Sequence, residues 1–367
     1  MLDAPTAPVD PFATVVRRID EPGTGAALRA AGPVVRAEAP AGGPVWIVTE
    51  AALARRVLAD ERVVKDPAFA PVDWNRWAAG LEPTAAEQPS LTTLDGPAHA
   101  ALRKAHAPLF GARRMQGYAG RIAEIAREQL AVDGTVDLAA DFTTRFPLTV
   151  ICELLGVPAD RVDQAVEACA GMGSYGPAEF AKVLGSFAEL AAAALEAGGG
   201  MAVELRERVP EGMTDQELSY LLFGLIFASQ ITTDSALGFL VASALGDPSD
   251  DLVRDVLRRH PPAPYTLWRF TRTEVDLDGV RLPERAPILV HLAGINAAGE
   301  GQGLPFGAGP HYCIGAQLAL VEMQVVADVL AADFPDARLA VPYDELRRVD
   351  RGVQGSRLVE LPVVLRG

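Results

Sequence analysis

The sequence predicts a mainly α-helical protein with a small β region, and three observations carry this prediction. Apolar residues make up 49% of the 367 positions and charged residues 22%, which is typical of a globular protein with a large core. Apolar residues at helical spacing dominate the chain, whereas strand-like runs are few and short. No Gly-, Ser- or Pro-rich linker interrupts the pattern, so we expect one domain over residues 1–367.

Helices are predicted wherever apolar residues recur three and four positions apart. Eight segments show this spacing: 49–60, 97–110, 118–131, 160–171, 178–197, 214–246, 249–259 and 315–333. The stretch 190–200, LAAAALEAGGG, is expected to end one helix and to form a solvated turn.

Strands are predicted where β-branched or alternating apolar residues form short runs. These runs cover 44–49, 268–283, 287–293 and 358–365. Asp278-Gly279 inside the second run is a turn pair that favours a β-hairpin. The strands therefore form a small sheet built from both ends of the chain.

Charge and cysteine usage limit the partners and the compartment. The formal net charge of −15 argues against nucleic acid and anionic membrane surfaces as partners, because both repel an acidic protein. The N-terminus lacks a secretory signal, and the apolar run 221–228 is shorter than the roughly 20 residues of a membrane span. The three cysteines are odd in number and widely spaced, so a disulfide framework is not expected and a cytoplasmic location is.

Cys313 is the cysteine whose surroundings point to chemistry. It lies in FGAGPHYCIG, a glycine-rich turn before a predicted helix, where backbone amides and the helix dipole favour a thiolate. A thiolate there could be a nucleophile, a redox sensor or a soft metal ligand, and a buried thiol could also be only a small apolar residue. One thiolate without further ligands suggests a metal that another group already holds, and haem iron with an axial cysteine is the obvious candidate.

The segment Phe306-Gly307-Ala308-Gly309-Pro310-His311-Tyr312-Cys313-Ile314-Gly315 resembles the haem-binding loop of the cytochrome P450 superfamily, F-G-x-G-x-H-x-C-x-G. Every fixed position of that motif is present. The resemblance runs in order from about residue 30 to the C-terminus. It implies the cytochrome P450 fold, with haem b between a long distal helix and the helix that follows the cysteine loop. It also implies that Cys313 is the axial ligand of the haem iron.

Four basic residues match positions that hold the haem propionates in this family. LDGPAHAALR resembles its D-x-P-x-H-x-x-x-R segment, so His99 and Arg103 would share one helical face. Arg269 resembles the strand arginine that reaches a propionate, and His311 matches a further contact. Alone, the His99–Arg103 pair would be read as a solvated helix face.

The sequence departs from the family around the cysteine loop. The E-x-x-R pair becomes Asp255 and Arg258, which could equally be an ion pair on a helix surface. GINAAGEGQGLPFGAGP runs almost directly into the cysteine loop, so the extended loop that normally precedes it is missing. That loss accounts for the short chain, and it removes part of the face on which a ferredoxin or flavodoxin would dock.

The helix expected over the haem also departs from the family. The pattern A-G-x-[D/E]-T-T is replaced by Ala228-Ser229-Gln230-Ile231-Thr232-Thr233. In the family the acid and the threonine relay protons, and isoleucine cannot carry a proton. We expect Thr232 and Thr233 to be catalytic, with Ser229 or Gln230 holding a substitute water. The alternative is a pair of threonines bonded back to the preceding turn.

The resemblance implies a cytochrome P450 monooxygenase of specialised metabolism that hydroxylates or oxidatively couples a small organic substrate. Two alternatives remain: peroxide-driven or redox-neutral chemistry, and a non-catalytic binding protein. Ferredoxin with its reductase is the implied electron donor. The expected pocket residues are Trp74, Leu225, Phe227, Ala228, Tyr265 and Trp268, although core packing would explain the aromatic ones equally well.

Overall fold

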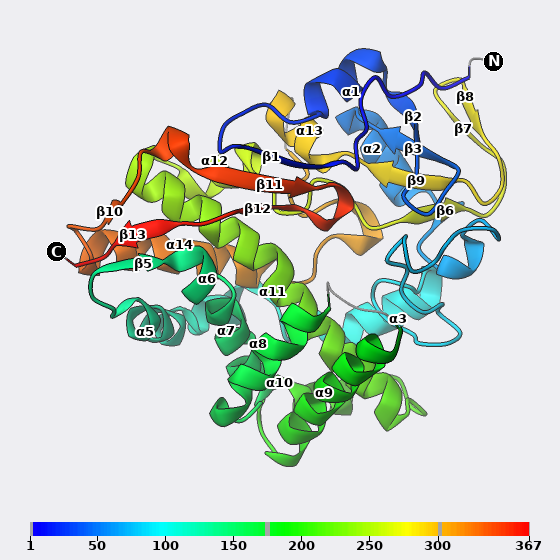
Figure 1. Cartoon of the computed structure of the whole chain (residues 1–367). Coiled ribbons are helices and arrows are strands. Elements are labelled where there is room, and N and C mark those ends of the chain that lie inside the picture. Colours follow the sequence, from blue (N-terminus) through cyan, green and yellow to red (C-terminus); the bar gives the residue numbers. More distant parts are fainter. Residues whose placement is uncertain (1–2, 173–176, 300–302, 367) are drawn as a thin grey trace. The chain divides into compact units, whose positions relative to one another are not determined.

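The computed structural model describes residues 3–172, 177–299 and 303–366 (Figure 1). The chain forms two compact units. One comprises Met1–Ala100, Arg254–Cys313 and Arg347–Arg357, and the other comprises Ala101–Val253, Ile314–Leu346 and Leu358–Gly367. The expectation of a single domain over the whole chain stays a prediction.

The first unit carries most of the β structure. Its central sheet has five strands in the order β2-β3-β9-β6-β4, in which β3 and β9 run parallel and the other neighbours run antiparallel. Their bounds are β2 Val34–Glu38, β3 Pro44–Val48, β4 Val63–Val64, β6 Arg269–Thr271 and β9 Pro287–Val290. The helices of this unit are α1 Gly25–Ala31, α2 Ala51–Ala59, α12 Leu252–Arg259 and α13 Leu292–Ala298, with α12 beginning in the second unit and α3 Gly96–His106 passing into it.

Two smaller sheets complete the first unit. Strands β1 Thr14–Arg18, β11 Arg347–Arg351 and β12 Ser356–Leu358 bring the two ends of the chain into one sheet (Figure 1), although β1 and β11 lie outside the predicted strand segments. Strands β7 Val275–Leu277 and β8 Val280–Leu282 form the predicted hairpin. Its turn residues Asp278 and Gly279 both have positive φ, which a two-residue hairpin turn of type I′ requires.

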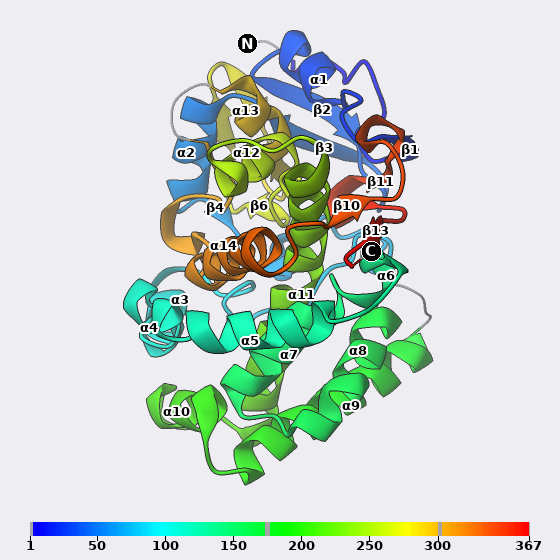
Figure 2. The ribbon, with the colours of Figure 1, turned by 90° about the vertical axis from the view of Figure 1, so that its left-hand side faces the viewer.

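The second unit is helical. Its elements are α4 Ala112–Gly117, α5 Ala119–Leu130, α6 Leu138–Asp141, α7 Arg145–Leu155, α8 Val162–Gly171, α9 Pro177–Glu196, α10 Gly200–Arg208, α11 Asp215–Gly246 and α14 Ala316–Asp333, with strands β5 Thr135–Asp137, β10 Arg338–Leu339 and β13 Pro362–Val364. Helix α11 packs against α7, α9 and α14 (Figure 2). It begins at a capping box in which Thr214 and Glu217 satisfy each other's backbone amides.

Helix α11 is long and apolar enough to cross a membrane, but 72% of its most apolar window is buried inside the protein. Burial of this kind is typical of the core helix of a globular domain. All eight predicted helices are present, with ends shifted by a few residues. Helices α1, α4, α6, α7 and α10 were not predicted. The segment 287–293, predicted as one strand, ends as β9 at Val290 and continues as α13.

Candidate active site

The cysteine loop is shaped by its two glycines. Gly307 has φ 72° and Gly309 has φ 71°, a left-handed conformation that favours glycine. A Cβ atom on Gly309 would lie 2.6 Å from the backbone oxygen of Leu58 in α2, so close approach also demands glycine there. The backbone N–H of Cys313 donates to Phe306 O at 3.0 Å and closes the loop.

The thiol of Cys313 is exposed, whereas those of Cys152 and Cys169 are buried. Burial raises the pKa of Cys152 and of Cys169 to about 12, so both stay protonated at neutral pH. Of the three thiols, that of Cys313 is therefore the one placed to meet a ligand.

A buried cluster of basic side chains lies in the same unit as Cys313. His99 is 3% exposed, and its ring stacks at 4.0 Å between centroids on the ring of His311. His311 Nε2 lies 3.3 Å from Asp95 Oδ1, and its Nδ1 lies 3.2 Å from Leu91 O. The structure thus brings together two of the predicted propionate residues with a carboxylate that was not predicted.

Arg269 and Lys65 add positive charge to this basic cluster. Arg269 is 4% exposed, and burial lowers its pKa to about 10. Its Nε atom has no hydrogen-bond partner among the residues that the structure describes. Lys65 is 7% exposed, and burial together with the neighbouring charge of Arg269 lowers its pKa to about 7. Two buried cations with an unfilled donor call for an anionic ligand.

Asp95 organises the basic cluster and offsets part of its positive charge. Its carboxylate accepts hydrogen bonds from the backbone N–H groups of Lys65 at 2.8 Å and Asp66 at 3.4 Å, besides its contact with His311. Burial alone would raise the pKa of Asp95, but these bonds outweigh burial and lower it. Arg103, the fourth predicted propionate residue, lies one turn beyond His99 on α3 and is half-buried.

Helix α11 carries an accessible strip in its middle. Ala228 is exposed, and Ile231 is 41% exposed, although most neighbouring residues of the helix are buried. Ser229 Oγ donates to Leu225 O at 2.7 Å, and Thr232 Oγ1 donates to Ala228 O at 3.3 Å. The Thr232 bond is one of the two that the alternative interpretation of Thr232 and Thr233 requires.

The buried side of α11 holds a carboxylate that sequence reasoning missed. Asp234 is 6% exposed and accepts hydrogen bonds from three side chains: the hydroxyls of Thr143 and Thr144 and the amide of Gln230, the last at 3.1 Å. Gln230 is therefore held by Asp234, and Thr233 is buried at 4% exposure. The sequence does show this acid: Asp234 lies three residues beyond Ile231, on a neighbouring face of the helix.

The Asp255–Arg258 pair fits the simpler of its two interpretations, an ion pair on a helix surface. Arg258 reaches Asp255 at 3.5 Å with side chains 45% and 34% exposed, so they form a surface ion pair. The shortened loop that would follow α13 includes residues 300–302, which lie outside the described residues.

The aromatic residues expected in the pocket pack into the core of the first unit. Trp74 lies edge-on to Trp268 at 4.9 Å between ring centroids, and Trp268 Nε1 donates to Ala79 O at 2.8 Å. Tyr265 is 4% exposed in the same core cluster. This is the core packing that the sequence left open. In the second unit Leu225 is buried and Phe227 is half-buried, stacked with Phe223.

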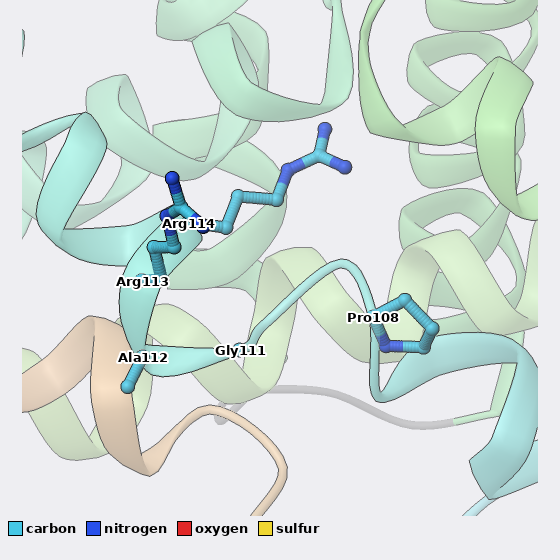
Figure 3. A pocket seen from close by; sticks show the side chains of 5 residues that line it. All are labelled: Pro108, Gly111, Ala112, Arg113 and Arg114. Carbon is cyan, nitrogen blue, oxygen red and sulfur yellow. The ribbon is translucent and has the colours of Figure 1, made fainter.

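A hollow with a volume of about 540 Å³ lies beside α4 in the second unit. Its walls are Pro108, Gly111, Ala112, Arg113 and Arg114 (Figure 3). Arg114 forms a two-pronged ion pair with Glu204, whereas Arg113 is exposed. The hollow is lined by a different set of residues from the basic cluster and from the strip on α11.

Comparison with known proteins decides the family. The cytochrome P450 family model matches residues 298–331, which include the cysteine loop. The chain is 41% identical to the cytochrome P-450 monooxygenase DoxA of Streptomyces sp. (strain C5), covering 99% of each protein. This chain belongs to the cytochrome P450 family. It is a P450 monooxygenase.

Further P450s agree with this assignment. The chain is 30% identical to the mycinamicin IV hydroxylase/epoxidase of Micromonospora griseorubida over 90% of this chain and 92% of that protein. The solved structure of CYP154C4 from Streptomyces sp. W2061 superposes with a TM-score of 0.80 at 28% identity, covering 100% of this chain and 98% of that one. The comparison with DoxA spans 419 aligned positions, more than the 367 residues here, so that relative carries segments that this P450 lacks.

The residues of this P450 fit the haem that the family carries. The first unit offers buried cations with an unfilled donor at Arg269, which suits the two carboxylates of a haem. In the second unit, the accessible strip on α11 presents Ala228 and Ile231, an apolar surface suited to a flat porphyrin or to an organic substrate.

Proposed function

We propose that this P450 oxidises a small organic substrate of specialised metabolism, by hydroxylation or by oxidative coupling or cyclisation, with a b-type haem held by Cys313. The observation that carries the proposal is the basic cluster, in which Arg269 and Lys65 are buried near Asp95, in the unit that also exposes the thiol of Cys313. Both features suit a haem and neither suits a packed core.

In this proposal each residue has a defined task. Cys313 would supply the thiolate that holds the haem iron, and the hydrogen bond from its backbone N–H to Phe306 O closes the loop. His99, Arg103, Arg269 and His311 would hold the two carboxylates of the cofactor. Gly307 has the left-handed backbone of the loop's turn, and Gly315 is the N-cap residue of α14. When bound, the haem supplies the activation of dioxygen that a thiolate ligand favours.

Proton delivery in this proposal depends on α11. Thr232 Oγ1 and Ser229 Oγ are the hydroxyls nearest to its accessible strip, and each can pass a proton between waters while bonded to the preceding turn. Asp234 with Gln230 and Thr233 supports the helix from its buried side. Ile231 offers no proton, so we expect delivery to be slow.

The substrate is proposed to be apolar and of natural-product size. The name of the relative mycinamicin IV hydroxylase/epoxidase supports such a substrate, and we propose a role for this chain in antibiotic biosynthesis. Leu225, Phe227 and Ala228 on α11 are the proposed substrate-binding residues of the second unit, and Trp74, Tyr265 and Trp268 those of the first unit. We place the protein in the cytoplasm.

Electrons are proposed to come from a ferredoxin and its reductase. The exposed Arg113 beside the hollow on α4 gives an acidic redox protein a cationic contact on a protein of net charge −15 (Figure 3). The shortened loop before the cysteine removes another part of the docking face that the family uses.

A second candidate function is favoured by Ile231. An isoleucine in place of the acid, together with the shortened loop, would suit peroxide-driven chemistry or a redox-neutral cyclisation, rearrangement or dehydration. Such reactions need less proton and electron delivery than the activation of dioxygen.

Turnover under two oxidant regimes separates these candidates. Mycinamicin IV and a set of polycyclic natural products would first be screened for a shift of the haem spectrum on binding. Binders would then be incubated with NADH, ferredoxin and ferredoxin reductase, or with hydrogen peroxide alone. Product with matching oxygen uptake in the first regime supports the monooxygenase. Product with peroxide alone, or with neither oxidant, supports the second candidate.

A further inference from the structure

Lysine is rare in this chain, and one lysine is buried. Of the 33 basic residues, three are lysines, at positions 65, 104 and 182, and the rest are arginines. Lys104 and Lys182 are exposed, whereas Lys65 is 7% exposed. An arginine stays charged in any protein, but a lysine can give up its proton when it is buried. The buried position 65 therefore holds a lysine, a residue type that is uncommon in this chain and whose charge can change with pH.

Charged groups surround Lys65 from several elements. It directly follows β4, which pairs with the strand that carries Arg269 through the Val64–Phe270 register. Arg269 is its positive neighbour, and Asp95 and Glu82 are its negative ones. His311 is also close, and burial lowers the pKa of its imidazole. Asp95 is already engaged with His311 and two backbone amides, and Glu82 accepts a hydrogen bond from Thr92.

This arrangement places two cations, Lys65 and Arg269, near each other in a buried site. Two permanently charged groups side by side in a buried site would repel each other and lose their hydration. Because the pKa of Lys65 is near 7, this lysine can lose its proton and so remove one of the two charges. An additional carboxylate in the basic cluster would reverse that balance and favour the ammonium form.

We propose that Lys65 is a further ligand of the cofactor's carboxylates and that its amine takes up one proton from solvent when they bind. The inference rests on the proposed function, because it takes the haem as the source of the carboxylates. Lys65 is a positioning residue: it fixes the cofactor through its carboxylates and takes no part in the reaction. In the absence of the carboxylates the neutral amine spares Arg269 a like-charged neighbour.

Haem retention should weaken as the pH rises above 7. In the cofactor-free protein Lys65 titrates near pH 7, and a bound carboxylate raises that pKa. The lysine's contribution to binding is therefore complete below pH 7, declines as the pH rises through the interval between the two pKa values, and is lost above the upper one. Affinity falls about ten-fold for each pKa unit that the carboxylate adds.

The test measures haem release from the holoenzyme to an excess of apomyoglobin at pH 7 and pH 9. Wild type should release haem faster at pH 9. Lys65→Met should release it about ten-fold faster than wild type at pH 7, with little change at pH 9, because the charge-assisted bond is gone. Lys65→Arg should hold haem at both pH values, because its charge is permanent. Lys182→Met, a change at an exposed lysine, is the matched control and should behave as wild type.

Two results would overturn the inference: wild type whose release does not depend on pH, or a folded Lys65→Met that releases haem at the wild-type rate. The first result is measured on wild type, so it tests the inference even if Lys65→Met does not fold. If the proposed function itself is wrong, wild type will lack the spectrum of a thiolate-ligated haem before any release is measured. The two failures can therefore be told apart.

Discussion

Gly309→Ala should destabilise the cysteine loop much more than Gly307→Ala, although the two glycines have the same backbone conformation. Their φ angles are 71° and 72°. A left-handed conformation costs an alanine about 1–2 kcal/mol at either position. The Cβ atom at position 307 would meet nothing within 4 Å, whereas that at 309 would lie 2.6 Å from Leu58 O and 3.2 Å from Leu58 C.

The clash sets the size of the difference. The neighbour of Gly309 is backbone of α2 and cannot rotate away, so relief requires a shift of the loop or of the helix, which adds about 1–3 kcal/mol. We expect Gly307→Ala to lower the free energy of unfolding by about 1–2 kcal/mol and Gly309→Ala by about 2–5 kcal/mol. Gly307→Ala is thus the matched control for backbone strain alone.

Urea unfolding of both variants, followed by circular dichroism and by the haem absorbance, measures this difference. The haem signal of Gly309→Ala should be lost at a lower urea concentration than that of Gly307→Ala. Equal losses in the two variants would refute the reasoning, because they would show that close approach to Leu58 contributes nothing to the loop.

Three further predictions concern the second unit. Ile231→Glu should raise oxygen-dependent turnover and Ile231→Gln should not, if the missing acid limits proton delivery; equal rates would mean that protons arrive by another route. Asp234→Ala should lower the free energy of unfolding by about 3 kcal/mol, because three side-chain donors lose their acceptor, and a loss below about 1 kcal/mol in urea titrations would contradict this. Glu322 on α14 is 1% exposed, neither of its carboxylate oxygens has a hydrogen-bond partner among the described residues, and burial raises its pKa well above 4.5. That raised pKa costs stability that grows from pH 4.5 up to the folded pKa, by about 1.4 kcal/mol per pKa unit. Glu322→Gln should therefore be more stable than wild type at pH 7 and should lose stability less steeply between pH 5 and pH 8; parallel pH profiles would contradict the assignment.

Helices with alternating apolar and charged residues, and the long apolar helix α11, could be predicted from the sequence, whereas α7 and α10 could not. The segments 49–60 and 118–131 alternate apolar and charged residues, and both form helices close to the predicted bounds. Helix α7, RFPLTVICELL, is buried almost all round and contains a proline and β-branched residues, so no helical period stands out. Helix α10 begins with glycine and has little apolar pattern, and it was missed for that reason.

The candidate site could be predicted in part. The motif around Cys313 gave His311 directly, and a second motif gave His99, because each residue lies at a fixed spacing within a short segment. Lys65 reaches the same cluster only because β4 pairs with the strand of Arg269, and a contact between positions some 200 residues apart leaves no local signal.

The spectrum of the purified protein, ferric and then reduced under carbon monoxide, tests the central claim most directly. Wild type should show the strongly red-shifted Soret band of a thiolate-ligated haem, and Cys313→Ala should lose that band. A wild type that binds no haem, or a band typical of histidine ligation, or a Cys313→Ala spectrum identical to that of wild type, would contradict the assignment of Cys313 as the axial ligand.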